Sequence, residues 1–247
     1  MRELLIINPN TSAHVSALLQ KHAQVAAGPQ VHVRTVTARF GAPYIADEAS
    51  FAVAAHATLD AWAEHLHSAG HSPDAVLIGC FGDPGLMALR ESSPVPVSGL
   101  AEASFFEAAR HGRYAIVTGG QRWGPMLQRH AHALGHAQQL AGIHTVVPTG
   151  VQLAADPAAA QRLLAQACQD AVHQLGDVQA VILVGAGLAG MAALVQADVM
   201  VPVIDSVTAG VHGALQAHTV TPARQAPGFD NLWVGLSPEM QALGPLG

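Results

Sequence analysis

The sequence contains few charged and few aromatic side chains. Only 11% of its 247 residues are charged, and 4% are aromatic. The formal net charge of −6 argues against the dense positive charge that binding to nucleic acid or to an anionic membrane surface requires. Because half of the residues are hydrophobic and so few of these are aromatic, Ala, Val and Leu must form most of the core.

Long hydrophobic runs and cysteines are also scarce. The first apolar run has only four residues, Leu4 to Ile7, before Asn8, which is too short for the apolar region of a signal peptide. The sequence has no run of eighteen apolar residues, as a membrane-spanning helix would need. Cys80 and Cys168 are too few for a disulfide framework. We therefore expect a soluble, cytoplasmic protein that contacts neither membranes nor nucleic acid.

Short apolar runs of strand length alternate with helical patterns along the chain. Between the runs, apolar residues recur at helical spacing, as at Leu59, Trp62 and Leu66, and Asp156-Pro157 is typical of a helix start. Strands that alternate with helices predict an α/β fold with parallel sheets. The eight predicted strands are 4–7, 31–36, 75–78, 95–97, 115–117, 143–147, 181–184 and 201–204.

The second half of the chain resembles the first. LLIINPNTS (4–12) corresponds to YAIVTGGQR (114–122), VLIGCFGDPGLMAL (76–89) to VILVGAGLAGMAAL (181–194), and VPVSGLAEA (95–103) to VPVIDSVTA (201–209). This repeat predicts two similar α/β lobes with flanking helices, related by a pseudo-twofold axis. We expect residues 1–105 and about 210–247 in the first lobe and 106–209 in the second. The strand ends of both lobes would then face a crevice that holds the ligand site.

One motif suggests a different function. Residues 185–190, GAGLAG, match the G-x-G-x-x-G fingerprint of dinucleotide-binding proteins, and an acid follows at Asp205. That fingerprint usually follows the first strand of its fold, whereas only about 57 residues remain here. In the repeat, Gly185 takes the position of Cys80, and Gly187 that of Gly82. The repeat therefore accounts for the glycines, and we expect no cofactor, although a nucleotide-dependent oxidoreductase or binding protein stays an alternative.

Four motifs together resemble one known family. INPNTS (7–12), GCFGDPGL (79–86), VTGGQRW (117–123) and VPVIDSV (201–207) are similar to the Asp/Glu/hydantoin racemase superfamily, and to its hydantoin-racemase-like branch in particular. The resemblance covers about residues 4–210. It implies two lobes with an active site between them. It also implies cofactor-independent chemistry by two cysteines, one on each face of the acidic carbon of the substrate.

The sequence departs from that pattern at the second cysteine. Cys80 matches the first cysteine, whereas the second would fall at Gly185, which has no side chain to move a proton. Cys168 does not replace it, because its register with Leu164 and Val172 predicts a buried core thiol. Cys80 ends an apolar strand, and we expect the following helix to stabilise its thiolate and to lower its pKa.

Polar and glycine residues at the other strand ends form the predicted substrate-binding set. Backbone N–H groups and hydroxyls at such turns can hold a carboxylate or imide oxygen and stabilise an enolate. Asp83 and Asp205 are weaker candidates for an acid or base, and His132 and His136 have no carboxylate or cysteine that would complete a metal site. The predicted set is Asn8, Asn10, Thr11, Phe81, Gly82, Thr118, Gly119, Gly120, Ala186 and Gly187, with Cys80 and Gly185 as the catalytic positions.

The leading hypothesis is a cofactor-independent racemase or isomerase, without a metal, in which Cys80 is the base or nucleophile. Its substrate would carry an acidic carbon next to a carboxylate or in a cyclic ureide such as a hydantoin. A single-cysteine decarboxylase that resembles arylmalonate decarboxylase is an alternative, as is a relative that only binds a small anion. In those decarboxylases the retained thiol lies in the second half, whereas here it lies in the first. The alanine-rich, weakly charged surface also favours a homo-oligomer.

Overall fold

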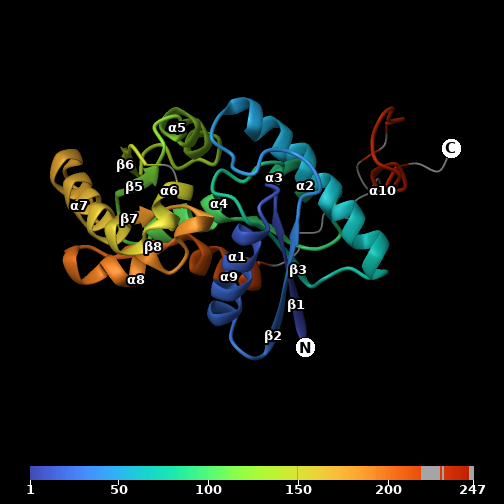
Figure 1. Cartoon of the computed structure of the whole chain (residues 1–247), viewed down its shortest axis with the longest axis horizontal. Coiled ribbons are helices and arrows are strands. Elements are labelled where there is room, and N and C mark those ends of the chain that lie inside the picture. The colour runs from blue at the N-terminus through green and yellow to red at the C-terminus, as the bar shows by residue number, and fades with distance from the viewer. Residues whose placement is uncertain (149, 218–228, 230, 245–247) are drawn as a thin grey trace.

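The computed structural model describes residues 1–148, 150–217, 229 and 231–244, and these form two four-stranded parallel sheets (Figure 1). The strand order is β2-β1-β3-β4 in the first sheet and β6-β5-β7-β8 in the second. The predicted α/β architecture with two similar lobes is therefore confirmed. The strands are β1 (Arg2–Asn8), β2 (Val31–Thr37), β3 (Ala75–Ile78), β4 (Val97–Gly99), β5 (Tyr114–Gly119), β6 (Leu140–Val146), β7 (Ala180–Leu183) and β8 (Val203–Asp205).

Helices connect the strands, and polar side chains cap several of their first turns. Ser12, Asp47 and Asp156 each accept a hydrogen bond from a backbone N–H of the helix that follows, which satisfies a donor that the helix itself leaves unpaired. The α-helices are α1 (Ala13–Ala27), α2 (Glu48–Ala69), α3 (Leu86–Ser92), α4 (Leu100–Ala109), α5 (Trp123–Ala133), α6 (Gly150–Ala155), α7 (Pro157–Leu175), α8 (Met191–Val195), α9 (Ser206–Gln216) and α10 (Pro238–Gln241), with 3-10 turns at η1 (Ala186–Leu188) and η2 (Gln196–Asp198).

The last strand of each sheet begins two residues later than the sequence predicts. Both β4 and β8 follow a proline, Pro96 and Pro202, which has no N–H to donate to a neighbouring strand. The two proline carbonyls still accept hydrogen bonds of 2.9 Å, from Val76 in the first sheet and Val181 in the second. The strand ladder therefore starts just after the proline in both lobes.

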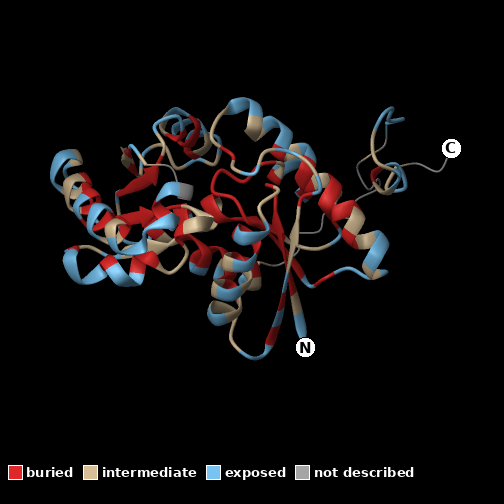
Figure 2. Cartoon of the chain, in the orientation of Figure 1, coloured by how far each residue is buried: buried red, intermediate tan, exposed pale blue. Residues whose placement is uncertain are grey.

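The two sheets share a core because one helix of each lobe packs on the sheet of the other lobe. Helix α4 follows β4 but packs on β7 and β8, whereas α9 follows β8 and packs on β3 and β4. The largest cluster of buried side chains accordingly includes Ile6 of β1, Phe105 of α4 and Ile182 of β7, and Figure 2 shows the central strands of both sheets mostly buried. Full burial of a side chain such as Phe105 contributes about 1.5–3 kcal/mol.

This exchange fixes how the lobes face each other. The carboxyl ends of the central strands of both sheets meet at one crevice, where the turns after β1, β3, β5 and β7 come together. The domain boundaries at residues 105 and 209 stay predictions. Within the described part of the chain, none of the helices combines the length and the hydropathy that a membrane span requires.

Candidate active site between the two lobes

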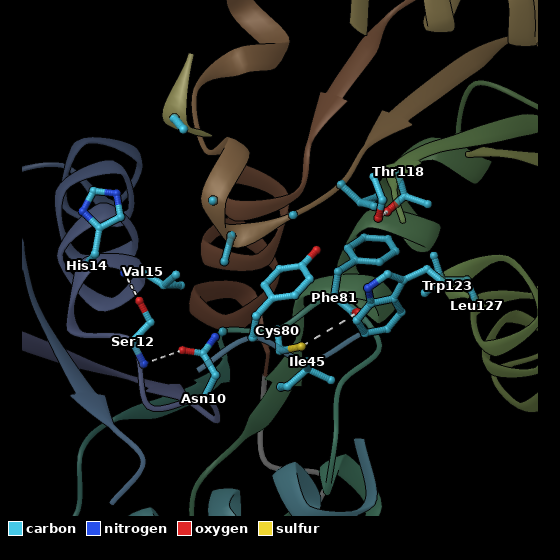
Figure 3. Close-up of a pocket in the computed structure, with 18 residues that line it drawn as sticks. Asn10, Ser12, His14, Val15, Ile45, Cys80, Phe81, Thr118, Trp123 and Leu127 are labelled. Carbon is cyan, nitrogen blue, oxygen red and sulfur yellow. Dashed lines mark hydrogen bonds between the residues drawn. The ribbon is translucent and has the colours of Figure 1, made fainter. Parts of the chain in front are cut away.

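A cavity of about 320 Å³ lies between the lobes, at the carboxyl ends of β1, β3, β5 and β7. Figure 3 shows Asn10, Ser12 and Val15 on one side of it and Phe81, Trp123 and Leu127 on the other. The two sides thus differ in polarity, although Val15 is apolar and Thr118, on the side of Trp123, is polar. Its lining residues are Asn10, Ser12, His14, Val15, Tyr44, Ile45, Gly79, Cys80, Phe81, Thr118, Gly119, Trp123, Leu127, Ala155, Val184, Gly185, Ala186 and Gly187.

Cys80 lies two residues after β3 and lines this cavity. The chain passes close to α1 here, as a Cβ added at Gly79 would lie only 2.8 Å from Leu19 Cδ1. Cys80 itself is buried, with 8% of its surface exposed. Burial raises the pKa of the Cys80 thiol well above its usual value, and the Asp83 carboxylate raises it further.

The expectation of a lowered thiol pKa at Cys80 was therefore wrong. It assumed that a helix starts directly behind the thiol, but α3 begins only at Leu86. The intervening turn contains Gly82 with a φ of 125° and Asp83 with a φ of 55°. Because the field of a helix terminus falls off within about one turn, it does not offset the cost of desolvating the thiolate.

Gly185 occupies the matching position in the second lobe. It follows β7 by two residues, as Cys80 follows β3, and it lines the same cavity. Its φ of 133° is rarely adopted by residues with a side chain. A Cβ added there would lie 3.6 Å from Leu188 Cγ, which is ordinary van der Waals contact. The turn thus has space for a side chain but not a relaxed backbone for one.

A buried polar network supports the side of the cavity next to β1. Asn8 Nδ2 donates to Asn10 Oδ1 at 3.0 Å and to Ser16 Oγ at 3.0 Å, and the Ser12 N–H donates to Asn10 Oδ1 at 2.9 Å. Asn8 is fully buried and does not line the cavity, so its side chain positions Asn10. Thr11 does not line the cavity either, and its N–H donates to the carbonyl of Ala42.

The structure brings together six of the ten predicted binding residues at the cavity: Asn10, Phe81, Thr118, Gly119, Ala186 and Gly187. The other four lie just outside the lining: Asn8, Thr11, Gly82 and Gly120. At Gly82 an added Cβ would lie 3.0 Å from the ring of Trp123 and 3.1 Å from that of Phe51. Gly82 therefore lets these rings approach the turn behind the cavity.

Phe81 was predicted at the cavity, but the other large apolar residues that line it were not. Trp123 and Leu127 lie on α5, where their spacing indicates one apolar face of a helix and no ligand contact. Trp123 directly follows the polar turn after β5, and that adjacency was a usable signal. Tyr44 and Ile45 come from the loop between β2 and α2, for which periodicity carries no signal.

Two predicted acid or base candidates serve a structural role instead. Asp83 accepts hydrogen bonds from Ala101 N at 2.9 Å and Glu102 N at 2.8 Å, and Asp205 accepts from Val207 N and Thr208 N. These bonds satisfy the first turns of α4 and α9. Neither aspartate lines the cavity, so neither is placed to act there as an acid or base.

The remaining candidates lie away from the cavity. Cys168 is fully buried in α7, as expected, and burial raises the pKa of its thiol to about 12. Among the residues that the structure describes, no three His, Cys, Asp or Glu side chains gather closely enough to hold a metal ion. After β7 the chain forms a 3-10 turn and the five-residue helix α8, not the long helix that follows a dinucleotide fingerprint.

The fold and the cavity define a class of protein, a two-lobed α/β enzyme with a thiol between its lobes. The sequence profile described as "Asp/Glu/Hydantoin racemase" matches residues 4–214. A hydantoin racemase from Pseudomonas sp. (strain NS671) is 31% identical over 211 residues, which are 85% of this chain and 83% of that protein. The chain belongs to the Asp/Glu/hydantoin racemase family, whose racemases are isomerases.

Solved structures agree with this assignment. An allantoin racemase from Klebsiella pneumoniae superimposes with a TM-score of 0.86 at 29% identity, over 100% of each chain. An arylmalonate decarboxylase superimposes with a TM-score of 0.60 at 17% identity, over 92% of this chain and 96% of that one. The latter similarity shows a shared fold alone. The family match covers residues 185–190, so the glycine-rich turn belongs to a racemase fold.

Proposed function

We propose that this enzyme moves a proton at an acidic carbon of a small cyclic ureide of the hydantoin type, and that Cys80 is the group that moves it. The observation that carries the proposal is that Cys80 lies in the cavity between the two lobes of the family's fold. Cys168 is buried in α7, so among the described residues Cys80 is the one thiol at this cavity.

The cavity suits a flat polar ring with an apolar substituent. Asn10, Ser12 and Thr118 offer amide and hydroxyl groups that can bind ring carbonyls and N–H groups. Trp123 and Leu127 offer a surface for an apolar substituent. The hydantoin racemases at about 31% identity support this substrate class.

The raised pKa of Cys80 favours one direction of proton transfer. A thiol that burial keeps protonated at neutral pH is a ready acid, and it must first lose its proton to act as a base. With Gly185 at the matching position, no thiol faces Cys80 across the cavity. We therefore expect proton exchange on the Cys80 face of the substrate and slow racemisation.

This single protonated thiol also favours a second candidate function, the decarboxylation of a small malonate. There the loss of CO₂ leaves a carbanion, and the thiol needs only to protonate it. The arylmalonate decarboxylase fold supports the candidate only at the level of architecture. A decarboxylase of this kind would deliver the proton from the first lobe, where Cys80 lies.

The test is incubation of each enantiomer of a 5-substituted hydantoin in D₂O, with deuterium incorporation and optical rotation followed together. The proposal expects one enantiomer to exchange with retention while the other stays inert. Efficient racemisation of both enantiomers would contradict the one-thiol account. Absence of exchange together with CO₂ release from an aryl-substituted malonate would replace the racemase function with the decarboxylase. Cys80→Ser is the control that must abolish either activity.

A further inference from the structure

Asp83 ties the turn that carries Cys80 to two other elements. Its carboxylate is buried and accepts hydrogen bonds from the N–H groups of Ala101 and Glu102 at the start of α4. Its Oδ2 also lies 3.1 Å from Nε2 of His130 on α5. The positive φ of Asp83, 55°, is uncommon outside glycine. The three hydrogen bonds of this carboxylate thus stabilise an unusual backbone conformation at Asp83, three residues after Cys80.

His130 makes this a contact between the lobes. It lies on α5 of the second lobe, the same helix that presents Trp123 and Leu127 to the cavity. The residue directly before it, Arg129, forms a bidentate pair with Glu48 of α2, at 2.8 and 2.9 Å. Both of these side chains are largely exposed. The Asp83–His130 pair is the more buried link, with 0% and 18% of the two side chains exposed.

The second lobe is built differently at the matching positions. In the repeat, Leu188 corresponds to Asp83, and Asp205 corresponds to Gly99. Asp205 caps its own helix and accepts a hydrogen bond of 2.8 Å from the N–H of Gly190. Gly99, by contrast, has no room for a side chain, because the Asp83 carboxylate lies where its Cβ would be. An aspartate thus lies within the turn only in the lobe that has the cysteine.

The Asp83 carboxylate also acts on Cys80 through its charge. It raises the pKa of the thiol, because a nearby negative charge disfavours the thiolate. The contact with His130 fixes where that carboxylate lies relative to the thiol. The other ionisable side chains around the pair are Glu102, which is bound to Arg90, and Tyr114 and His136, which lie around the Phe105 ring.

We propose that Asp83 and His130 are positioning residues for Cys80. The pair holds the Cys80 turn between α4 and α5, and so fixes the position of the thiol in the cavity. A catalytic effect of the pair rests on the proposed function of Cys80. The positioning itself can be tested without that function, because alkylation of Cys80 requires no substrate.

The test is the rate of Cys80 alkylation by iodoacetamide at one fixed pH, mapped by mass spectrometry. His130→Ala removes the contact with Asp83, so the turn should loosen, and the buried thiol should react about 3- to 10-fold faster than in the wild type. His130→Gln keeps an N–H donor for the carboxylate and should stay close to the wild-type rate.

Two matched variants separate this effect from general loosening of the structure. His136→Gln changes a second histidine that packs on the Phe105 ring but makes no contact with Asp83 among the described residues. Arg129→Gln breaks the neighbouring link between the lobes. Both should leave the rate of Cys80 alkylation at the wild-type value.

Several results would overturn the proposal. These are a wild-type alkylation rate in His130→Ala, or equal effects of His130→Ala and His136→Gln. Should His130→Ala fail to fold, His130→Phe removes the same hydrogen bond while it fills the space, and it should show the same faster alkylation. In turnover, His130→Ala should lower kcat with little change in KM, and His130→Gln should restore it. Absence of turnover on hydantoins with the expected alkylation rates would refute the proposed function and leave the positioning role standing.

Discussion

Gly185→Cys places a thiol at the position that matches Cys80 in the second lobe. Gly185 lines the cavity, and a side chain there would find ordinary contact with Leu188, 3.6 Å from the added Cβ. The backbone is the obstacle, because the φ of 133° is one that residues with a side chain rarely adopt. The substitution therefore has two opposing effects, because it adds a second thiol to the cavity and strains the backbone that carries it.

The magnitudes of the two effects are separable. Backbone strain of this kind costs about 1–3 kcal/mol, which for a protein of this size lowers Tm by about 2–12 °C. A positioned acid or base contributes about 10²–10⁴-fold in rate. We expect a variant that is folded but less stable, and that racemises 5-substituted hydantoins at least about 10²-fold faster than the wild type.

The assay measures optical rotation and deuterium incorporation for both enantiomers, together with Tm. Ala186→Cys is the matched control, because it adds a thiol to the same turn, at a residue that also lines the cavity, without the unusual φ. It should give the smaller gain. A folded Gly185→Cys variant with no gain, or with no more than Ala186→Cys, would refute the assignment of Gly185 as the position opposite Cys80.

Three further predictions follow from individual side chains. Cys80→Ser should reduce deuterium exchange by at least about 10²-fold at unchanged Tm; exchange at the wild-type rate would remove Cys80 from the mechanism. Because burial raises the pKa of both thiols, iodoacetamide should label Cys80 and Cys168 slowly at neutral pH, with Cys80 ahead because it lines the cavity; faster labelling of Cys168 would contradict this order. Burial lowers the pKa of His65, and neither ring nitrogen has a hydrogen-bond partner among the described residues. The unfolded state therefore binds a proton that the folded state excludes, and the free energy of unfolding should fall as pH drops below about 6.5. Urea unfolding should show a weaker fall for His65→Leu than for the matched change at the exposed His67, and equal pH dependence of the two variants would exclude His65 as the cause.

The sequence by itself determined the architecture and most of the strand ends that form the site. Strand and helix periodicities are local, because they record which face of each element must be buried. The repeat then implied a second lobe of the same kind, and its alignment matched Gly185 to Cys80. The prolines before β4 and β8 displaced the starts of these strands by two residues each, and β6 begins three residues earlier than predicted.

Tertiary structure decided which strand-end residues face the cavity and what their environment does to them. Asn8 and Asn10 are two residues apart, yet the first is buried as support and the second lines the cavity. The pKa of Cys80 depends on desolvation and on the charge of Asp83, and neither can be read from neighbouring letters of the sequence. The contact between Asp83 and His130 joins residues 47 positions apart through the packing of α5 on the Cys80 turn. Such contacts arise only when the exchanged helices α4 and α9 join the two lobes, because long-range packing, not local propensity, brings these groups together.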